Sequence, residues 1–409
     1  MTILYILLVL LIVTRAFGEA AQRLGQPALT GELLSGVVLG LVAARFTEHL
    51  PILAGLADNE VFHAIRDLGI FFLMLLAGIE LQPRELAQAT RSAMLVALAG
   101  MLLPLGLGFA LGMLYLPASE YRFAQALFIG VALSVTAVPV AIKVMRDVGR
   151  MDTAAGRVIV SAAVIDDVLS LLLLAVLTGV IRAGTLPDAT SLLLLAGKVA
   201  LFFAITIPLG RYLFPWLARA LKRACQEEFE LSGVLVTALA YALLAEALSM
   251  HFIIGAFMAG LFFGRGTADP ETYRDVRAKI AGVTTGFLGP VFFASIGLDL
   301  DLSALNRIPV FVLWMLLLAV VGKVLGAGLA GRLGGLSRAE ALVVGVAMNA
   351  RGAVELVIAN VALQAGLFSV PEPVPAVVAG LFSSVVTMAV LTTLVTPVAM
   401  RWLLVRRAV

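Results

Sequence analysis

Cysteine and charge are both scarce in this chain. Its single cysteine, Cys225, excludes an internal disulfide framework. Charged residues make up 13% of the sequence and hydrophobic residues 61%, whereas soluble domains carry about 25% charge. The ten-residue alternation of a transmembrane β-barrel is also missing. The formal net charge of +3 gives no reason to expect a nucleic-acid partner. These absences predict an all-α polytopic membrane protein embedded in a lipid bilayer.

Long apolar runs recur along the whole chain, whose mean hydropathy is +1.06. Runs of about 17–25 residues match the ~30 Å hydrocarbon core of a bilayer. The N-terminal run lacks a basic flank, so we expect a first spanning helix and not a cleaved signal. We predict a single transmembrane domain over residues 1–409 with about thirteen transmembrane helices, at 3–21, 26–44, 61–81, 92–115, 123–145, 157–180, 190–214, 229–248, 251–264, 280–298, 308–330, 339–363 and 376–404.

The basic residues are concentrated in alternate loops. Of the 29 Lys and Arg residues, 20 would lie in loops on one side of the membrane, including Arg150 and Arg157. Loops rich in Lys and Arg face the cytoplasm. We therefore expect a multi-pass protein of the cell (inner) membrane, with the N-terminus outside and the C-terminus cytoplasmic.

The two halves of the chain share glycine-centred motifs. Three ordered matches pair GELLSGVVLG with GAFMAGLFFG, GIELQPREL with GLDLDLSAL, and ALFIGVALSVTAV with ALVVGVAMNARGA. Chance similarity between apolar sequences is the alternative, but the three matches occur in the same order in both halves, which argues against chance. Each pair is seven spans apart, an odd number, so the repeats must have opposite orientations. We predict two inverted six-helix repeats, at about 1–180 and 229–409, joined by a linking helix at about 190–214.

Two adjacent carboxylates, Asp166 and Asp167, interrupt the apolar run that follows Arg157. At 1.5 Å per residue the pair lies about 15 Å past Arg157, near the middle of the bilayer. A charged Asp there costs about 2.5–3.5 kcal/mol, and such residues usually mark ion or proton pathways. The pair is therefore the first candidate for a transport site.

A second candidate feature is a pair of broken helices at matching positions of the repeats. Ser134 and Thr136 precede Pro139 in the middle of the fifth span, where proline removes a backbone donor. Asn349 and Gly352 occupy the same depth in the twelfth span. Broken helices at membrane depth need a cavity or buried protein to satisfy their backbone, and their ends can bind ions. A kink sealed by neighbouring helices is the alternative for Pro139.

Three further charges lie inside predicted spans. Lys323 is about halfway along the eleventh span. Arg351 and Glu355 are four residues apart, so we expect them to share a helix face and to pair. The expected role of this pair is mainly structural, with shaping of the cavity as a second role. Asp166 and Asp167 point about 100° apart, so one can face the ion path while the other pairs with Lys323.

These residues resemble the monovalent cation/proton antiporter superfamily, and most closely its second branch, with Kef-type proteins and bacterial sodium–proton exchangers. The resemblance rests on VIDDV, SVTAVP, the mid-span Lys323 and MNARGAVELVIANVALQAG. It implies a sodium/proton antiporter-like fold with crossed broken helices, and a homodimer. It also implies that Asp167 binds the ion and carries the proton, that Asp166 pairs with Lys323, and that Thr136, with Ser134 and nearby backbone, lines the cation site.

The chain departs from the Kef-type proteins in two ways. At the carboxylate pair those proteins tend to have Gln-Asp, and they carry a cytosolic nucleotide-binding domain beyond the membrane part. Since the sequence given ends at Val409, we expect no gating by such a domain or by glutathione.

The chemistry predicts a secondary active Na⁺ or K⁺/proton antiporter, because a proton and a cation compete for one carboxylate. Li⁺ suits the same oxygens.

Core spans 4–6 and 11–13 would move against scaffold spans 1–3 and 8–10. We expect no cofactor and no enzyme activity. In an intramembrane aspartyl protease two aspartates face each other across one substrate, which the sequence neighbours Asp166 and Asp167 cannot readily do on one helix. A sodium-coupled solute symporter and a non-transporting ion sensor stay open as alternatives. A proton released by Lys323 would make exchange electrogenic.

Overall fold

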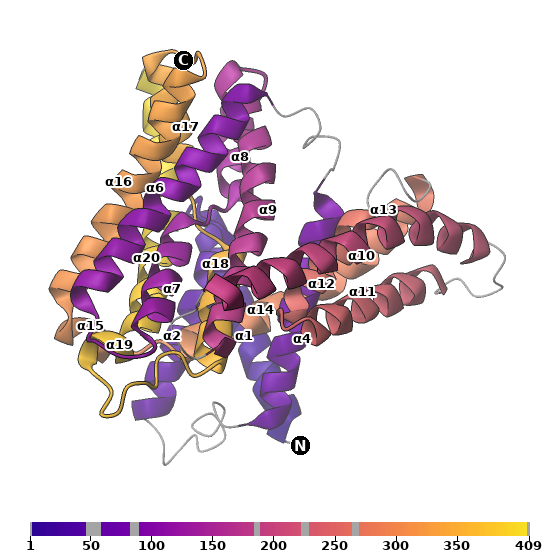
Figure 1. Ribbon diagram of the computed structural model, residues 1–409, viewed down its shortest axis with the longest axis horizontal. Helices are drawn as coiled ribbons and strands as arrows, with labels where there is room; N and C mark the ends of the chain where they lie inside the picture. Colours follow the sequence, from indigo (N-terminus) through magenta and orange to yellow (C-terminus); the bar gives the residue numbers. More distant parts are fainter. Residues whose placement is uncertain are drawn as a thin grey trace. The chain divides into compact units, whose positions relative to one another are not determined.

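The computed structural model describes residues 2–45, 59–81, 90–183, 189–221, 229–263 and 270–406, and all regular structure within these ranges is helical (Figure 1). Cys225 lies outside them. The helices are α1 (Thr2–Arg23), α2 (Ala28–Arg45), α4 (Glu60–Glu80), α6 (Arg91–Tyr115), α7 (Arg122–Ser134), α8 (Val138–Asp147), α9 (Ala154–Ala183), α10 (Ala189–Leu221), α11 (Phe229–Ala247), α12 (Phe252–Phe262), α13 (Pro270–Val283), the π-helical turn η1 (Thr284–Leu288), α14 (Gly289–Leu298), α15 (Leu302–Arg307), α16 (Pro309–Leu333), α17 (Arg338–Ala347), α18 (Ala353–Gln364), α19 (Ala376–Ala379) and α20 (Leu381–Arg406).

The predicted all-α membrane fold is confirmed. Among the described residues, eight helices are long and apolar enough to cross a membrane by length and composition. Four shorter apolar helices accompany them, at Ala28–Val42, Arg122–Ser134, Phe252–Phe262 and Ala353–Gln364. The number thirteen stays a prediction, because several expected spans are too short or are divided between two helices.

Some helix boundaries differ from the predicted spans. The helix expected at 280–298 begins at Pro270 and continues through η1 into α14. Likewise α9 begins at Ala154 and ends at Ala183, several residues outside the expected 157–180. Hydropathy locates the apolar part of a helix, whereas the helix itself can continue into polar sequence at either end.

Side-chain caps explain where several helices begin. The Thr90 hydroxyl accepts a hydrogen bond from Ala93 N at the start of α6. Before α17, the Ser337 hydroxyl accepts from Glu340 N while the Glu340 carboxylate accepts from Ser337 N, which forms a capping box. These caps satisfy backbone N–H groups that the first helical turn leaves without partners.

The chain forms two compact units, each built from several segments. Unit 1 comprises residues 1–17, 32–84 and 187–298, and unit 2 comprises residues 18–31, 85–186 and 299–409.

Unit 1 contains two close helix crossings at glycines. A Cβ at Gly78 of α4 would collide with the Phe257 carbonyl of α12, and a Cβ at Gly260 of α12 would collide with a carbonyl of α4. The same holds for Gly36 of α2 against α14 and for Gly297 of α14 against α2. Only the absence of a side chain lets these backbones approach so closely, as is common between membrane helices.

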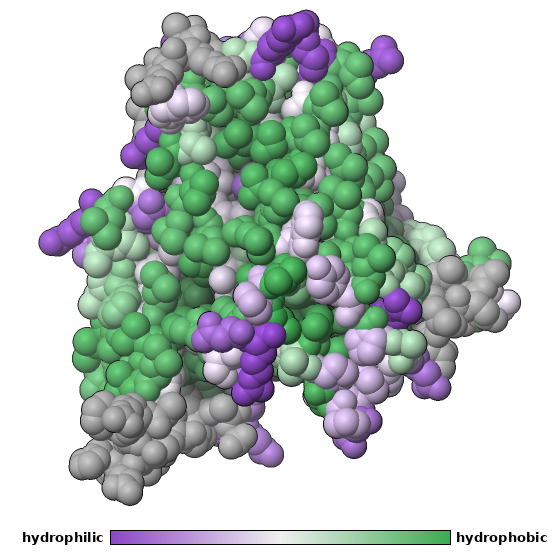
Figure 2. All heavy atoms as spheres, turned by 90° about the vertical axis from the view of Figure 1, so that its left-hand side faces the viewer, coloured by the Kyte–Doolittle hydropathy of each residue, from purple (hydrophilic) through white to green (hydrophobic). Residues whose placement is uncertain are grey.

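Unit 2 is organised around α6, which packs along α16 and α7 (Figure 1). One apolar core of this unit joins α6, α8, α9, α16, α17 and α20 through residues such as Val96, Ile159, Val344 and Met400. Figure 2 shows a face with α16 in view, and hydrophobic side chains cover most of it. Large apolar side chains of α16, including Leu313 and Leu329, are exposed. Such a surface is suited to contact with hydrocarbon chains of lipid.

Candidate functional site

Two helices of unit 2 are interrupted at the positions that the sequence predicted. The first interruption follows Ser134, where α7 ends, and three non-helical residues precede α8. Pro139 occupies the first turn of α8, a position that needs no backbone donor, and its side chain is outside the described residues. The expected mid-span break is therefore present as a helix end followed by a new helix start.

The second interruption separates α17 from α18. Residues 348–352 are non-helical, and Ala350 O accepts a hydrogen bond of 2.7 Å from Ala137 N in the first interruption. Gly352 comes so close to Ala137 that a Cβ at Gly352 would overlap the Ala137 Cβ. The two interruptions thus meet in one place, which we call the crossing.

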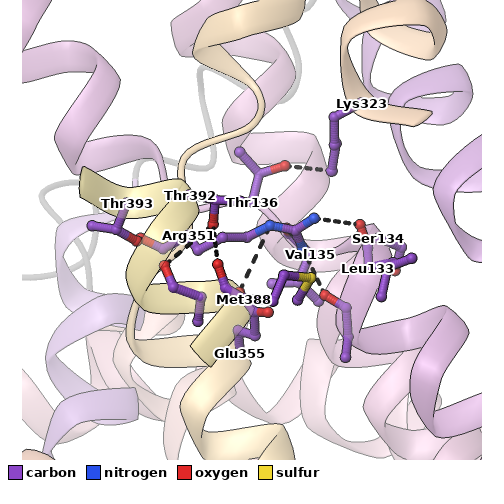
Figure 3. Close-up of polar contacts among 12 residues, drawn as sticks. Leu133, Ser134, Val135, Thr136, Lys323, Arg351, Glu355, Met388, Thr392 and Thr393 are labelled. Carbon is purple, nitrogen blue, oxygen red and sulfur yellow. Dashed lines mark hydrogen bonds and ion pairs between the residues drawn. The ribbon is translucent and has the colours of Figure 1, made fainter. Parts of the chain in front are cut away.

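Arg351 lies in the crossing and is completely buried. Its guanidinium donates to the carbonyl oxygens of Ala132 and Val135, at 2.7 and 2.6 Å, and to Leu133 O at 2.7 Å. Figure 3 shows this side chain pointing at the end of α7. The last carbonyls of a helix have no intrahelical partners and carry partial negative charge. Arg351 therefore caps α7 from a distant part of the sequence.

Glu355 and Thr393 complete the surroundings of Arg351. The Arg351 Nε atom lies 3.8 Å from Glu355 Oε2, and both side chains are fully buried. The Thr393 hydroxyl of α20 donates to the Arg351 carbonyl at 3.0 Å (Figure 3). The ion pair follows the predicted spacing, but Arg351 precedes α18 and does not share a helix with Glu355, so the expected common helix face was wrong.

Lys323 connects α16 with α9 and with the crossing. Its ammonium donates to the Thr136 hydroxyl at 2.5 Å, as Figure 3 shows. The same nitrogen lies 3.7 Å from Asp166 Oδ1, and both charged side chains are 0% exposed. A buried charge needs a partner of opposite sign. Here Asp166, Lys323 and Thr136 bring α9, α16 and the interruption between α7 and α8 together within unit 2.

The two adjacent aspartates have different surroundings. Asp166 is completely buried, whereas Asp167 is partly exposed. Neighbouring residues on a helix point about 100° apart, which explains the difference. The pair therefore provides one carboxylate held by Lys323 and one that is partly exposed.

The remaining predicted residues line the helix ends. The Ser134 hydroxyl is buried and donates to Val131 O at 2.8 Å, so its hydrogen is used inside α7. Asn349 is 4% exposed, and its side-chain oxygen has no hydrogen-bond partner among the described residues.

Sequence reasoning missed three buried polar residues of unit 2. These are Thr393, Gln125, whose amide donates to Leu367 O and Val370 O, and Asn360. Asn360 offered the clearest signal, because it interrupts the apolar run VIANVAL. Thr393 lies among several hydroxyl residues of α20, and nothing in the sequence distinguishes it from them.

The predicted site residues offer oxygen ligands. Within the described part of the chain, no group of three or more His, Cys, Asp or Glu side chains could hold a multivalent metal. Carboxylate, hydroxyl and carbonyl oxygens are the ligands that hard cations prefer. Asp167, Thr136 and the unwound backbone offer those three kinds of oxygen.

Comparison with known proteins identifies the family of the chain. The family model described as "Sodium/hydrogen exchanger, transmembrane" matches residues 6–406. The Na(+)/H(+)-K(+) antiporter GerN of Bacillus cereus is 29% identical, with 96% of this chain and 94% of GerN covered. A Na(+)/H(+) antiporter of Enterococcus hirae is 28% identical, with 94% and 96% covered.

A solved structure shows the same fold. The sodium proton antiporter MjNhaP1 of Methanocaldococcus jannaschii superimposes with a TM-score of 0.71, covering 99% of this chain and 98% of that one. The identity is 18%, so this likeness concerns the fold.

Proposed function

Because the chain belongs to the sodium/hydrogen exchanger family, we propose that it is a secondary active antiporter exchanging a monovalent cation for protons by alternating access. The observation that carries the proposal is the buried set of Asp166, Lys323 and Thr136 beside the partly exposed Asp167. Intramembrane charges with such partners mark ion and proton pathways. The proposed substrates are Na⁺, K⁺ or Li⁺, and H⁺.

Asp167 is the proposed carrier of both substrates. It is the more accessible of the two carboxylates, while Asp166 is occupied by Lys323. A proton on Asp167 removes the negative charge that a cation needs, and a bound cation disfavours protonation. Each substrate therefore displaces the other from Asp167. Exchange is obligatory if the site can switch from one side of the membrane to the other only when it holds a cation or a proton.

Thr136 and the crossing are proposed to complete the cation site. The Thr136 hydroxyl accepts a hydrogen bond from Lys323 and keeps a second lone pair. Arg351 donates hydrogen bonds to the last carbonyl oxygens of α7. These carbonyl groups therefore do not depend on a bound cation for a partner. Ser134, Pro139, Asn349, Gly352 and Glu355 are proposed to shape this region.

Unit 2 is proposed as the moving core and unit 1 as the scaffold. All helices that carry the site belong to unit 2, which is compact in its own right. Rigid-body movement of one bundle is the usual form of alternating access. We further propose a homodimer in the cell membrane, with the N-terminus outside and the C-terminus in the cytoplasm; the loop charges support this orientation.

The test is cation-driven proton movement in proteoliposomes with an internal pH dye. Addition of Na⁺, K⁺ or Li⁺ should release protons through the wild-type protein, and Asp167→Asn should abolish the signal. Asp152→Asn, an exposed acidic position between α8 and α9, is the matched control and should leave the flux unchanged. Silence of the wild type with every cation would contradict antiport, and flux that survives Asp167→Asn would contradict the role of this residue.

A further inference from the structure

One helix inside unit 2 carries a buried amide that no protein group satisfies. Residues from Glu355 to Ala362 of α18 are buried, and Asn360 among them is 0% exposed. Neither the side-chain oxygen nor the nitrogen of Asn360 has a hydrogen-bond partner among the described residues. Burial of an unpaired amide costs free energy, and each such group in a native protein needs an explanation such as an ordered water.

The helices around α18 carry similar groups. α18 packs against α7, α9 and α20. Each of these three helices has a buried side-chain oxygen without a partner in the described part of the chain, namely Gln125 Oε1, Ser170 Oγ and Thr387 Oγ1. By contrast, the Thr178 hydroxyl of α9 donates to Leu174 O at 2.9 Å, as hydroxyls in apolar helices usually do. A buried hydroxyl in these helices can therefore find a backbone partner, and the lack of a partner at the other groups is a feature of their positions.

All four groups lie in the same half of unit 2. Gln125 donates to Leu367 O and Val370 O, so the start of α7 lies beside the end of α18. On the other side of the crossing, Ile159 of α9 and Met400 of α20 pack in one core with α8 and α17. The later part of α9 and the earlier part of α20 therefore lie with α7 and α18. We call this the α7/α18 half.

The unpaired groups lie at different levels along their helices. Counted at 1.5 Å per residue along its own helix, Glu355 lies about 3 Å and Asn360 about 10 Å past Ala353 in α18, and Gln125 lies about 14 Å before Ser134 in α7. By the same count Ser170 lies about 6 Å past Asp166 in α9, and Thr387 lies about 9 Å before Thr393 in α20. Both Glu355 oxygens also lack a hydrogen-bond partner. Water molecules can bridge polar groups that are too far apart for a direct hydrogen bond.

We propose that, in the form that is open to that side, these side chains hold a chain of water molecules that carries protons between the carboxylates at the crossing and the α7/α18 end of unit 2. A buried water needs about two to four polar partners, and hydroxyl and amide groups both donate and accept. A proton leaving a carboxylate passes to the first water while the last water releases one at the far end, so no charge accumulates. The use of this route rests on the proposed antiport, whereas its hydration does not.

Hydroxyl-radical footprinting of the full chain in nanodiscs tests the hydration directly, because radiolysis of bound water oxidises side chains that bulk solvent does not reach. Phe128 is completely buried, and its ring centroid lies 5.0 Å from that of Phe368 in the same half. We expect both rings to be oxidised in the wild type and less so in Asn360→Leu and Ser170→Ala. Thr178→Val, on the same helix as Ser170, should leave the oxidation unchanged. Equal labelling in all four proteins would overturn the water chain.

Proton flux in proteoliposomes tests whether the water chain is used. Loss of one hydrogen-bonding group should lower proton turnover about tenfold in Asn360→Leu and Ser170→Ala, with the cation KM unchanged. Ser170→Ala keeps the test decisive if Asn360→Leu fails to fold. Wild-type turnover in Ser170→Ala would overturn the proton route. A wild type that moves no protons but loses labelling on substitution would contradict antiport and leave the hydrated chain standing.

Discussion

Replacement of Arg351 by alanine should destabilise unit 2 more than any other single truncation at the crossing. The side chain is completely buried and makes three hydrogen bonds to carbonyls at the end of α7. It also forms an ion pair with Glu355 at 3.8 Å. Its removal leaves those carbonyls and a buried carboxylate without a counter-charge.

The size of the effect follows from these contacts. Neutral hydrogen bonds between membrane helices contribute about 0.6 kcal/mol each, which would give about 2 kcal/mol for three. Hydrogen bonds from a charged group contribute about 1.5–3 kcal/mol each, and removal of one member of a buried pair costs about 3–5 kcal/mol. Because the guanidinium is both charged and paired, we expect a loss of about 3–5 kcal/mol for Arg351→Ala.

Two further variants separate the charge from the geometry. Arg351→Lys keeps the charge but not the planar fork that reaches three carbonyls, so its stability should fall between those of the wild type and Arg351→Ala. Glu355→Gln in the Arg351→Ala background should restore part of the loss, because it removes the unpaired carboxylate.

Thermal unfolding in detergent, followed by fluorescence-detected size exclusion, ranks the four proteins. The expected order is wild type, Arg351→Lys, Arg351→Ala/Glu355→Gln and Arg351→Ala, from most to least stable. A wild-type melting temperature for Arg351→Ala, or a double variant less stable than Arg351→Ala alone, would refute the capping role.

Three other changes have defined outcomes. Lys323→Ala should make the exchange electroneutral, and an unchanged dependence of proton flux on membrane potential would contradict a proton released by Lys323. Gly352→Ala should disrupt the crossing because its Cβ would overlap that of Ala137, so cation affinity measured by flux should weaken at least about tenfold, the effect of about 1.4 kcal/mol. Gly260→Val should reduce the yield of folded monodisperse protein, whereas Gly106→Val, with nothing within 4 Å of its added Cβ, should not; equal yields would contradict the close crossing in unit 1.

The features that could be predicted from the sequence are those that conflict with an apolar environment. The Asp166–Asp167 pair and Lys323 each interrupt a long apolar run. Charges at such positions are costly in a membrane, so the sequence alone indicates that they need partners. Pro139 and Gly352 marked the helix interruptions for a similar reason, since neither residue suits the middle of a helix.

The role of Arg351 could not be predicted in the same way. Its spacing from Glu355 indicated a pair along one helix, and the pair exists at 3.8 Å. Its three hydrogen bonds, however, go to residues more than 200 positions away, and they depend on where the crossing brings the end of α7. Sequence periodicity predicts which residues share a helix face, but it does not predict the contact between two helix interruptions. For the same reason the sequence did not indicate the role of Thr393.

The glycine crossings of unit 1 connect the sequence repeat with the packing. The repeat aligns Gly36 with Gly260 and Gly78 with Gly297. In the structure Gly36 and Gly297 form the crossing of α2 with α14, while Gly78 and Gly260 form the crossing of α4 with α12. The alignment therefore exchanges one crossing for the other, as two repeats with the same packing would, and the inverted orientation of the repeats stays a prediction. Each crossing joins a helix of the first half of the chain to a helix of the second, so neither half can bury these glycine faces alone.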